Sequence, residues 1–198
     1  MIAFNNIDNG TPYLEFKKLY DLASKNGQKN IEVACIASYS KSANQVNSRF
    51  VNLKYLNKKD FIFFTNYNSP KAEDFREHNQ ISAVIYWDSI NFQIRIKAEI
   101  QKTSREFSKA YFSKRDKKKN ALAISSNQSN KISSFDDVYK NYEQTLKSKN
   151  LKECPEYWGG YLFTPFYFEF WEGHESRLNK RDAYEFQNKQ WNHCNLQP

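Results

Sequence analysis

Pairs of cationic and phenolic side chains in this sequence have spacings that suit anion binding. Arg49 and Lys54 lie at odd and even positions of a segment predicted to be extended, so they should point to opposite faces and could hold two different anions. Tyr111 and Arg115 are four residues apart on a predicted helix, where both side chains could donate to one phosphate. Taken singly, such pairs are more often solvated cations or core aromatic residues.

Two other segments could carry similar chemistry. Ser69 and Lys71 stand at the start of a predicted helix, where unpaired N–H groups and the helix dipole favour negative charge. Arg177 and Arg181 are four residues apart in segment 171–181, whose mixture of Trp, His, Gly and Arg is unusual for a plain turn. None of these features alone identifies a function.

Composition narrows the classes of partner. The formal charge of +8 and the isoelectric point near 9.2 suggest nucleic acid, a membrane surface or a phosphorylated small molecule. The basic run 114–119 could contact nucleic acid, although such runs are usually solvated. The three histidines have no metal-ligand spacing, and the three cysteines form neither a disulfide framework nor a zinc motif. Scattered glycines exclude a dinucleotide-binding glycine motif and a P-loop.

The elements that must position these residues can be predicted from caps and periodicity. Caps predict helices that begin at Thr11-Pro12, at Ser69-Pro70, at a Thr103 to Glu106 capping box and at Ser134. Apolar runs predict strands at 31–38, 49–56, 60–66, 81–87, 92–101, 161–171 and 183–191, with Pro165 interrupting the sixth. Six or seven strands joined mostly by short turns indicate one mainly β domain with helices (α+β), an antiparallel barrel covering residues 1–198.

Seven segments, read together, resemble the pyridoxamine 5′-phosphate oxidase family, in the family's order and spacing across nearly the whole chain. They are Arg49-Phe-Val-Asn-Leu-Lys54, Phe64-Thr-Asn-Tyr-Asn-Ser-Pro-Lys71, Gln93-Ile-Arg95, Tyr111-Phe-Ser-Lys-Arg115, Gln128-Ser129, Trp158-Gly-Gly160, and Glu169-Phe-Trp171 followed by Arg177-Leu-Asn-Lys-Arg181.

The resemblance implies an FMN-binding split β-barrel that forms a homodimer, with FMN at the subunit interface and a dimerisation and substrate segment at about 155–198. It implies that Arg49 and Lys71 hold the FMN phosphate, with polar contacts from Gln128 and Ser129. The other implied cofactor contacts are Val51, Lys54, Phe64, Thr65, Gln93, Trp171 and Arg181. The implied substrate contacts are Lys54, Tyr111, Arg115, Lys119, Arg177 and Asn179, with Arg177 as the catalytic arginine over the reacting carbon.

The implied activity is oxidation of pyridoxamine or pyridoxine 5′-phosphate to pyridoxal 5′-phosphate, a step of vitamin B6 metabolism. Oxygen would be the electron acceptor and hydrogen peroxide the second product. The basic charge would then serve phosphates, so we expect a phosphorylated pyridine as substrate and neither nucleic acid nor a membrane as partner. Residues 1–10 lack a signal-peptide pattern and no apolar run could span a membrane, so we expect a cytoplasmic protein.

Several positions depart from the family pattern. Pro70 replaces a second phosphate-binding arginine, and Lys119 replaces a serine at the substrate phosphate. Asn179 and Lys180 replace the histidine and the acidic residue of the R-L-H-D-R motif, and Asn195 replaces an arginine. Asn179 cannot carry charge or transfer a proton near neutral pH, as histidine can. Two alternatives therefore stay open: an FMN-dependent oxidoreductase with another small substrate, and a non-catalytic flavin-binding or nucleic-acid-binding barrel.

Overall fold

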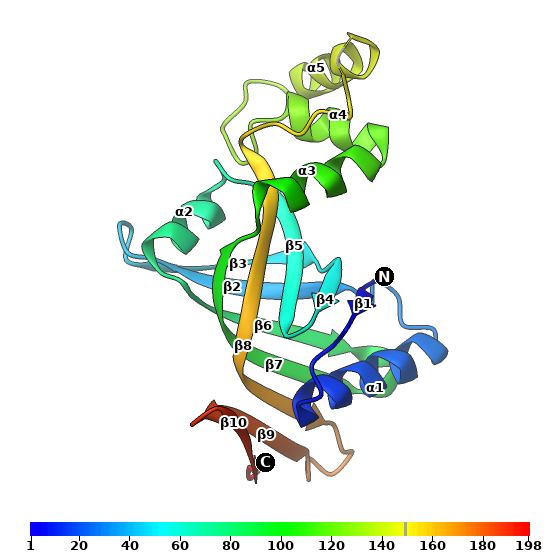
Figure 1. The fold of residues 1–198 in the computed structure, drawn as a ribbon, viewed down its shortest axis with the longest axis vertical. Helices are drawn as coiled ribbons and strands as arrows, with labels where there is room; N and C mark the ends of the chain where they lie inside the picture. The colour runs from blue at the N-terminus through cyan, green and yellow to red at the C-terminus, as the bar shows by residue number, and fades with distance from the viewer. Residues whose placement is uncertain (149) are drawn as a thin grey trace.

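The computed structural model describes residues 1–148 and 150–198, and its centre is a strongly curved ten-stranded sheet (Figure 1). Eight strands follow one another across the sheet in the order β1 (Ala3–Asn5), β4 (Tyr55–Asn57), β5 (Asp60–Asn66), β8 (Trp158–Glu172), β7 (Phe92–Lys102), β6 (Gln80–Trp87), β2 (Val33–Ser40) and β3 (Gln45–Asn52). A hairpin of β9 (Lys180–Gln187) and β10 (Gln190–Asn195) pairs with β8 through β9. The predicted α+β antiparallel fold is confirmed, and the parallel pair of β1 with β4 is an addition to it.

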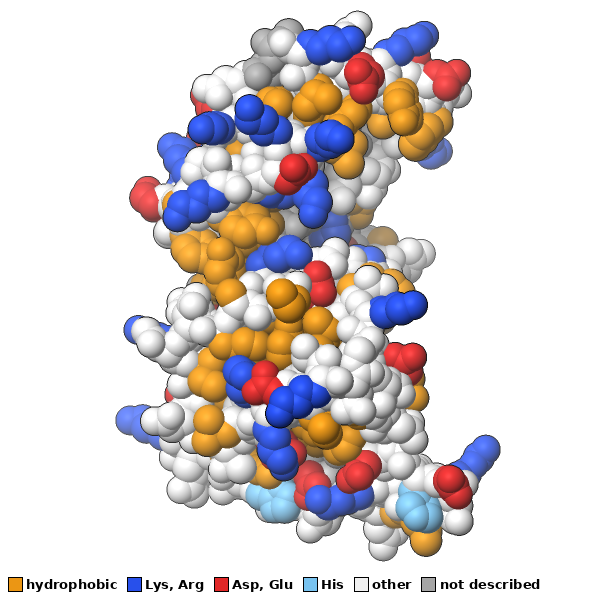
Figure 2. Space-filling model, turned by 90° about the vertical axis from the view of Figure 1, so that its right-hand side faces the viewer, with side chains coloured by type: hydrophobic (Ala, Val, Ile, Leu, Met, Phe, Trp, Pro, Cys, Tyr) orange, Lys and Arg blue, Asp and Glu red, His pale blue; other side chains and the backbone are white. Residues whose placement is uncertain are grey.

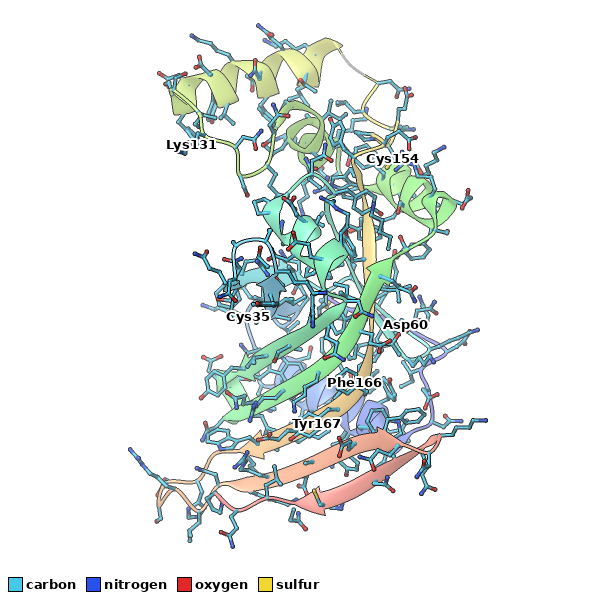
Figure 3. All side chains as sticks on the ribbon, turned by 90° about the vertical axis from the view of Figure 1, so that its left-hand side faces the viewer. Cys35, Asp60, Lys131, Cys154, Phe166 and Tyr167 are labelled. Atoms are coloured by element: carbon cyan, nitrogen blue, oxygen red, sulfur yellow. The ribbon has the colours of Figure 1, made fainter. Side chains whose placement is uncertain are left out.

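Strand β8 connects the two ends of the molecule. Its first part, from Trp158 to Phe163, pairs with β5, and its last part, from Tyr167 to Glu172, pairs with β9. The prediction that Pro165 interrupts this strand was wrong. Tyr167 lies opposite Lys97 and Pro165 opposite Ala98, so Phe166 is the extra residue of a bulge (Figure 3). A proline that cannot donate a ladder hydrogen bond is tolerated at such a bulge.

Five α-helices complete the fold. α1 (Thr11–Lys25) buries Phe16, Leu19, Tyr20 and Ala23 in the same core as the sheet, as its apolar spacing predicts. α2 (Pro70–Glu77) begins at the predicted Ser69 cap. α3 (Arg105–Lys114), α4 (Lys117–Ser125) and α5 (Phe135–Ser148) gather at the end of the molecule opposite the β9–β10 hairpin (Figure 1). No helix in the described part of the chain is long and apolar enough to cross a membrane.

Two predicted caps were displaced by one residue. Gly10, not Thr11, caps α1. Ser104, not Thr103, caps α3, and its Oγ accepts a hydrogen bond from the Phe107 N–H at 3.2 Å. The predicted buried stripe of α3 was also wrong: the helix buries Ser108 and Phe112. Phe107, Ala110 and Tyr111 line a cavity instead of the core.

The strand prediction was least accurate around residues 49–56. β3 ends at Asn52, Leu53 is fully buried, and a separate short strand, β4, begins at Tyr55. Lys54 therefore lies between two strands, so strand alternation does not fix its direction relative to Arg49. β1, β10 and helix α4 were not predicted either, and the chain has more strands than the six or seven expected.

Candidate functional site

A cavity of about 680 Å³ lies between the sheet and helices α3 and α4, a volume within the usual range for ligand pockets. Nine of the residues predicted from the sequence line it: Val51, Lys54, Phe64, Thr65, Lys71, Tyr111, Arg115, Lys119 and Gln128. Sequence reasoning missed the other lining residues, which are Phe50, Asn52, Tyr55, Phe107, Ala110, Lys114, Asp116 and Trp158. On the face shown in Figure 2, Lys and Arg side chains gather over the helical end of the molecule.

Lys71 forms one cationic end of the cavity. Its Nζ donates hydrogen bonds to Ser69 Oγ at 3.0 Å, Thr65 Oγ1 at 3.1 Å and Gln128 Oε1 at 3.3 Å. Burial, together with the nearby charge of Arg49, lowers the pKa of Lys71 to about 8. Among the described residues no carboxylate pairs with Lys71, so an anionic ligand would be its counter-ion.

Arg49 stands beside this end but does not line the cavity. Its Nη1 donates to Ser38 Oγ at 2.6 Å and to the Ile36 carbonyl at 3.2 Å, and its Nη2 lies 3.4 Å from Asp74 Oδ2. Asp74 is only 3% exposed and also accepts a hydrogen bond from Ser38 Oγ at 2.6 Å. The guanidinium is thus fixed by buried neighbours, Ile36, Ser38 and Asp74.

A column of aromatic rings forms one wall. Phe64 stacks on Tyr111 with ring centroids 3.7 Å apart and planes 5° apart, and on Trp158 at 5.3 Å and 8°. The guanidinium carbon of Arg115 lies 5.2 Å from the Trp158 ring centre, within the range of a cation–π contact. Tyr111 and Arg115 both line the cavity, but α3 ends at Lys114 and Arg115 is its extended C-cap residue, so helical spacing is not what brings them together.

Lys54, Arg115 and Lys119 form the second cationic end. Burial is the main cause that lowers the pKa of Lys54; the charges of Lys119 and Arg115 lower it further, while Glu32 opposes them. Glu32 Oε1 lies 3.9 Å from Lys54 Nζ, a long ion pair. The charges that act on Lys54 are those of Lys119 and Arg115, whereas the charge that acts on Lys71 is that of Arg49. The cations in and beside the cavity are therefore described as two groups, Lys54 with Arg115 and Lys119, and Lys71 with Arg49.

Gln93, Trp171 and Arg181 lie elsewhere, in one row across three strands. Gln93 on β7 is opposite Trp171 on β8, which is opposite Arg181 on β9. Two residues back along β8 from Trp171, and so on the same face of the sheet, buried Glu169 (2% exposed) accepts from Arg181 Nε at 2.9 Å, Arg95 Nη1 at 3.0 Å and Tyr167 OH at 2.9 Å. This buried carboxylate fixes the direction of Arg181.

Arg177 and Asn179 lie in the turn between β8 and β9, not in an extended segment. Arg177 has a φ of 59°, in the left-handed region, and its N–H donates to the His174 carbonyl at 2.9 Å. Asn179 Oδ1 accepts from the His174 N–H at 3.0 Å. In an extended segment the two-residue spacing of Arg177 and Asn179 would predict that both side chains point to one side, and the turn shows that this prediction is wrong. Ser129, with a φ of 72°, lies in the loop before α5 and does not line the cavity.

The two sets of residues are far apart within one chain. Trp158 lines the cavity, and Trp171 follows thirteen residues later on the same strand, a separation of up to about 40 Å along β8. Figure 1 places the two ends of β8 at the helical end and at the β9–β10 hairpin. Neither Trp171 nor Arg181 lines the cavity of its own chain. The described residues contain no cluster of His, Cys, Asp and Glu suited to a metal ion.

Comparison with known proteins gave matches along most of the chain. A family model described as pyridoxamine 5′-phosphate oxidase matches residues 25–146, and one described as the pyridoxine 5′-phosphate oxidase C-terminal dimerisation region matches residues 158–198. A pyridoxine/pyridoxamine 5′-phosphate oxidase of Hydrogenovibrio crunogenus is 35% identical over 176 residues, covering 88% of this chain and 81% of the relative. One from Colwellia psychrerythraea is 34% identical over 193 residues, covering 96% and 88%.

Two solved structures have the same fold. PhzG from Burkholderia lata, in complex with tetrahydrophenazine-1-carboxylic acid, superposes with a TM-score of 0.88 at 22% identity, covering 94% of this chain and 92% of that one. A pyridoxamine 5′-phosphate oxidase-related, FMN-binding protein from Nostoc punctiforme gives 0.76 at 12% identity, covering 92% and 97%. At these identities the likenesses establish the split-barrel fold and nothing finer.

Proposed function

Because the chain belongs to the pyridoxamine 5′-phosphate oxidase family, we propose that it is an FMN-dependent oxidase that converts pyridoxamine or pyridoxine 5′-phosphate to pyridoxal 5′-phosphate. Oxygen is the proposed electron acceptor and hydrogen peroxide the second product. The observation that carries this proposal is the pair of separate cationic groups in one cavity. One phosphate of a cofactor and one phosphate of a substrate match these two groups.

The residues of the Lys71 end fit the phosphate of FMN. Lys71 has neutral hydrogen-bond partners and no carboxylate partner among the described residues, and its lowered pKa indicates a charge that a phosphate would stabilise. Arg49 adds a second cation beside it, and Gln128 offers an amide. The cavity volume is sufficient for a cofactor of this size. FMN, when bound, supplies the acceptor for the hydride that leaves the carbon bearing the amine or alcohol.

The other end would hold and orient the substrate. Lys54, Arg115 and Lys119 supply positive charge, and the Tyr111 hydroxyl supplies a donor on the same face as Arg115. The Phe64, Tyr111 and Trp158 rings exclude water from one side of the cavity. These residues bind and position the substrate, and we propose no part for them in proton transfer.

We propose that a second copy of the chain completes the site. Gln93, Trp171, Arg177, Asn179 and Arg181 lie away from the cavity of their own chain, and four of them fall in the part that matches a dimerisation region, 158–198. A homodimer would place these residues over the cavity of the other copy, with Arg177 against the pyridine ring. The segment at about 155–198 would thus serve both dimerisation and substrate binding.

A second candidate is an oxidoreductase of the same family that acts on a different small substrate. The specific observation in its favour is the altered turn, where Asn179 and Lys180 stand in place of a histidine and an acidic residue. Both candidates share the fold and the proposed cofactor, so only the substrate separates them.

The test is to mix the FMN-loaded protein with pyridoxamine 5′-phosphate in the absence of oxygen and follow flavin absorbance. The proposal predicts bleaching with this compound or with pyridoxine 5′-phosphate, and much slower bleaching with unphosphorylated pyridoxamine. Arg177→Ala is the matched control and should bleach far more slowly than the wild type. Bound FMN that is bleached by neither phosphate ester would refute the proposed substrate and favour the second candidate.

A further inference from the structure

Arg115 differs from the other arginines that are not fully exposed in having no acidic partner. Four of the seven arginines lie within 4.0 Å of a carboxylate: Arg49, Arg95, Arg105 and Arg181. Within the described residues, no carboxylate lies within 4.0 Å of the Arg115 guanidinium, which is half-buried. Burial lowers its pKa, while Tyr111 and the neighbouring Asp116 oppose that change. A half-buried guanidinium without a hydrogen-bonded carboxylate is well placed to pair with an anionic ligand.

The contacts of Arg115 leave one side of its guanidinium available. Nη1 donates to the Lys119 carbonyl at 2.8 Å and to Asn120 Oδ1 at 3.1 Å. The guanidinium carbon lies over the Trp158 ring, 5.2 Å from its centre. In the described part of the chain, Nε and Nη2 have no hydrogen-bond partner, and Arg115 lines the cavity. The N–H groups that remain can therefore reach a ligand in the cavity.

Asn120 is the buried anchor of this arrangement. It is 1% exposed, and its Nδ2 donates to the Phe112 carbonyl at 2.9 Å and to the Leu151 carbonyl at 2.7 Å. These two bonds fix the orientation of the amide, so its oxygen must point toward Arg115. The amide is neutral, so it holds the guanidinium in place without cancelling its charge.

We infer that Asn120, which is neither catalytic nor in the cavity wall, is the positioning residue for anion recognition at Arg115. It directs the free edge of the guanidinium to the cavity and preserves its charge for a phosphate ester. This inference rests on the proposed function, because it assigns Arg115 to the phosphate of the substrate. An aspartate at the same position would pair with Arg115 and compete with that phosphate.

The experiment measures binding, not turnover, with FMN-loaded protein. The probes are 4-deoxypyridoxine 5′-phosphate and unphosphorylated 4-deoxypyridoxine, which lack the group that is oxidised, and the method is titration calorimetry. Asn120→Asp should weaken binding of the phosphorylated probe by at least about tenfold, the scale of one charge-assisted contact, and leave the other probe unchanged. Asn120→Ser, which stays neutral but cannot reach Arg115, should weaken it by about threefold to tenfold.

A double-mutant cycle separates positioning from general stability. In an Arg115→Lys background the guanidinium Nη1 is gone, so Asn120→Ser should cause no further loss of the phosphorylated probe. The comparison of Asn120→Ser in the two backgrounds also tests the inference if Asn120→Asp fails to fold. Asn120→Asp could fail to fold because an aspartate has no N–H groups to donate to the Phe112 and Leu151 carbonyls. Equal losses in the two backgrounds, or equal losses for the two probes, would overturn the inference.

The proposed function can fail separately. A wild-type protein that binds FMN but shows no preference for the phosphorylated probe would refute the substrate assignment. A wild type with that preference, together with Asn120 variants that retain it in full, would refute only the role of Asn120.

Discussion

The affinity for FMN should depend on pH through the protonation of Lys71. Its pKa in the free site is lowered to about 8, first by burial and then by Arg49, while Thr65, Ser69 and Gln128 contribute only neutral groups. A bound phosphate would raise that pKa again. At neutral pH, Lys71 is charged in both the FMN-free and the FMN-bound protein, so FMN affinity should be constant there. Above pH 8 the free protein loses this charge, and FMN affinity should fall, with a slope that approaches about tenfold per pH unit.

Fluorescence titration of the protein with FMN between about pH 7 and pH 9.5 checks this expectation. Lys71→Arg is the matched variant, because a guanidinium stays charged throughout this range and should abolish the decline. An affinity of the wild type that does not change across the range would show that Lys71 does not bind the phosphate.

A second prediction for a single residue concerns Asn179. Its Oδ1 accepts a hydrogen bond from the His174 N–H. A histidine could accept the same bond through Nδ1 and leave Nε2 to donate to the substrate. Asn179→His should therefore raise kcat/KM with pyridoxamine 5′-phosphate by about tenfold. No gain in a variant with unchanged thermal stability would indicate that the turn has been rebuilt for another substrate.

Single residues were predictable from the sequence where local geometry is regular. Tyr111 and Arg115 both line the cavity, although Arg115 is the C-cap residue just beyond the last turn of α3 and not part of the helix. Strand alternation failed for Arg49 and Lys54, because the strand ends at Asn52. The role of Asn120 has no local signal, since its partners at Phe112 and Leu151 are brought together only by the fold.

At the scale of elements, α4 was missed because its first turn carries lysines at 117–119. Positive charge at a helix N-terminus opposes the helix dipole, so a basic run does not indicate that a helix begins there. Asp116 compensates as the N-cap, its side chain accepting from the Lys119 N–H at 3.1 Å. An anion in the cavity beside Lys119 would relieve the same unfavourable charge.

Helix α3, which carries Tyr111, should depend on its true cap. Ser104 Oγ accepts the hydrogen bond that closes the first turn, whereas Ser113 lies exposed near the other end and donates only to the Ala110 carbonyl. Ser104→Ala should lower the free energy of unfolding by about 1 kcal/mol. Ser113→Ala, the matched control on the same helix, should change it by less than about 0.5 kcal/mol in denaturant titrations. Equal effects of the two changes would contradict the cap assignment.

Elements with strong local signals were predicted well, and elements fixed by distant partners were not. Strand β7 alternates cleanly, and Ile94, Ile96, Ala98 and Ile100 are all buried as expected. β1 has only three residues and exists because β4 pairs with it, and the bulge at Phe166 exists because β7 and β8 differ in length there. No local pattern contains that information.

For the whole molecule, the central claim is that two copies share each site. Family resemblance predicted from the sequence both the residues that line the cavity and those of the row that contains Trp171 and Arg181. Composition and periodicity could not place these two sets at opposite ends of β8. That separation is a property of the folded chain: Trp158, at the start of β8, lines the cavity, whereas Trp171, near its end, pairs with Arg181 on β9. Figure 1 shows the start of β8 near helix α3 and its end near the β9–β10 hairpin. A closed two-fold dimer would place the row of each copy at the cavity of the other, which gives two equivalent sites.

Complementation between two variants tests this claim most directly. In the proposed dimer, each site combines the cavity of one copy with the Gln93–Trp171–Arg181 row of the other. Lys71→Glu should abolish FMN binding by changing the cavity, and Arg181→Glu should abolish it by changing the row. After the two purified variants are mixed and allowed to exchange subunits, half of the dimers are mixed, and each has one intact site. The account predicts recovery of about a quarter of the wild-type FMN per chain, measured by flavin absorbance after gel filtration. No recovery on mixing, with subunit exchange verified, or tight FMN binding by a monomer, would contradict it.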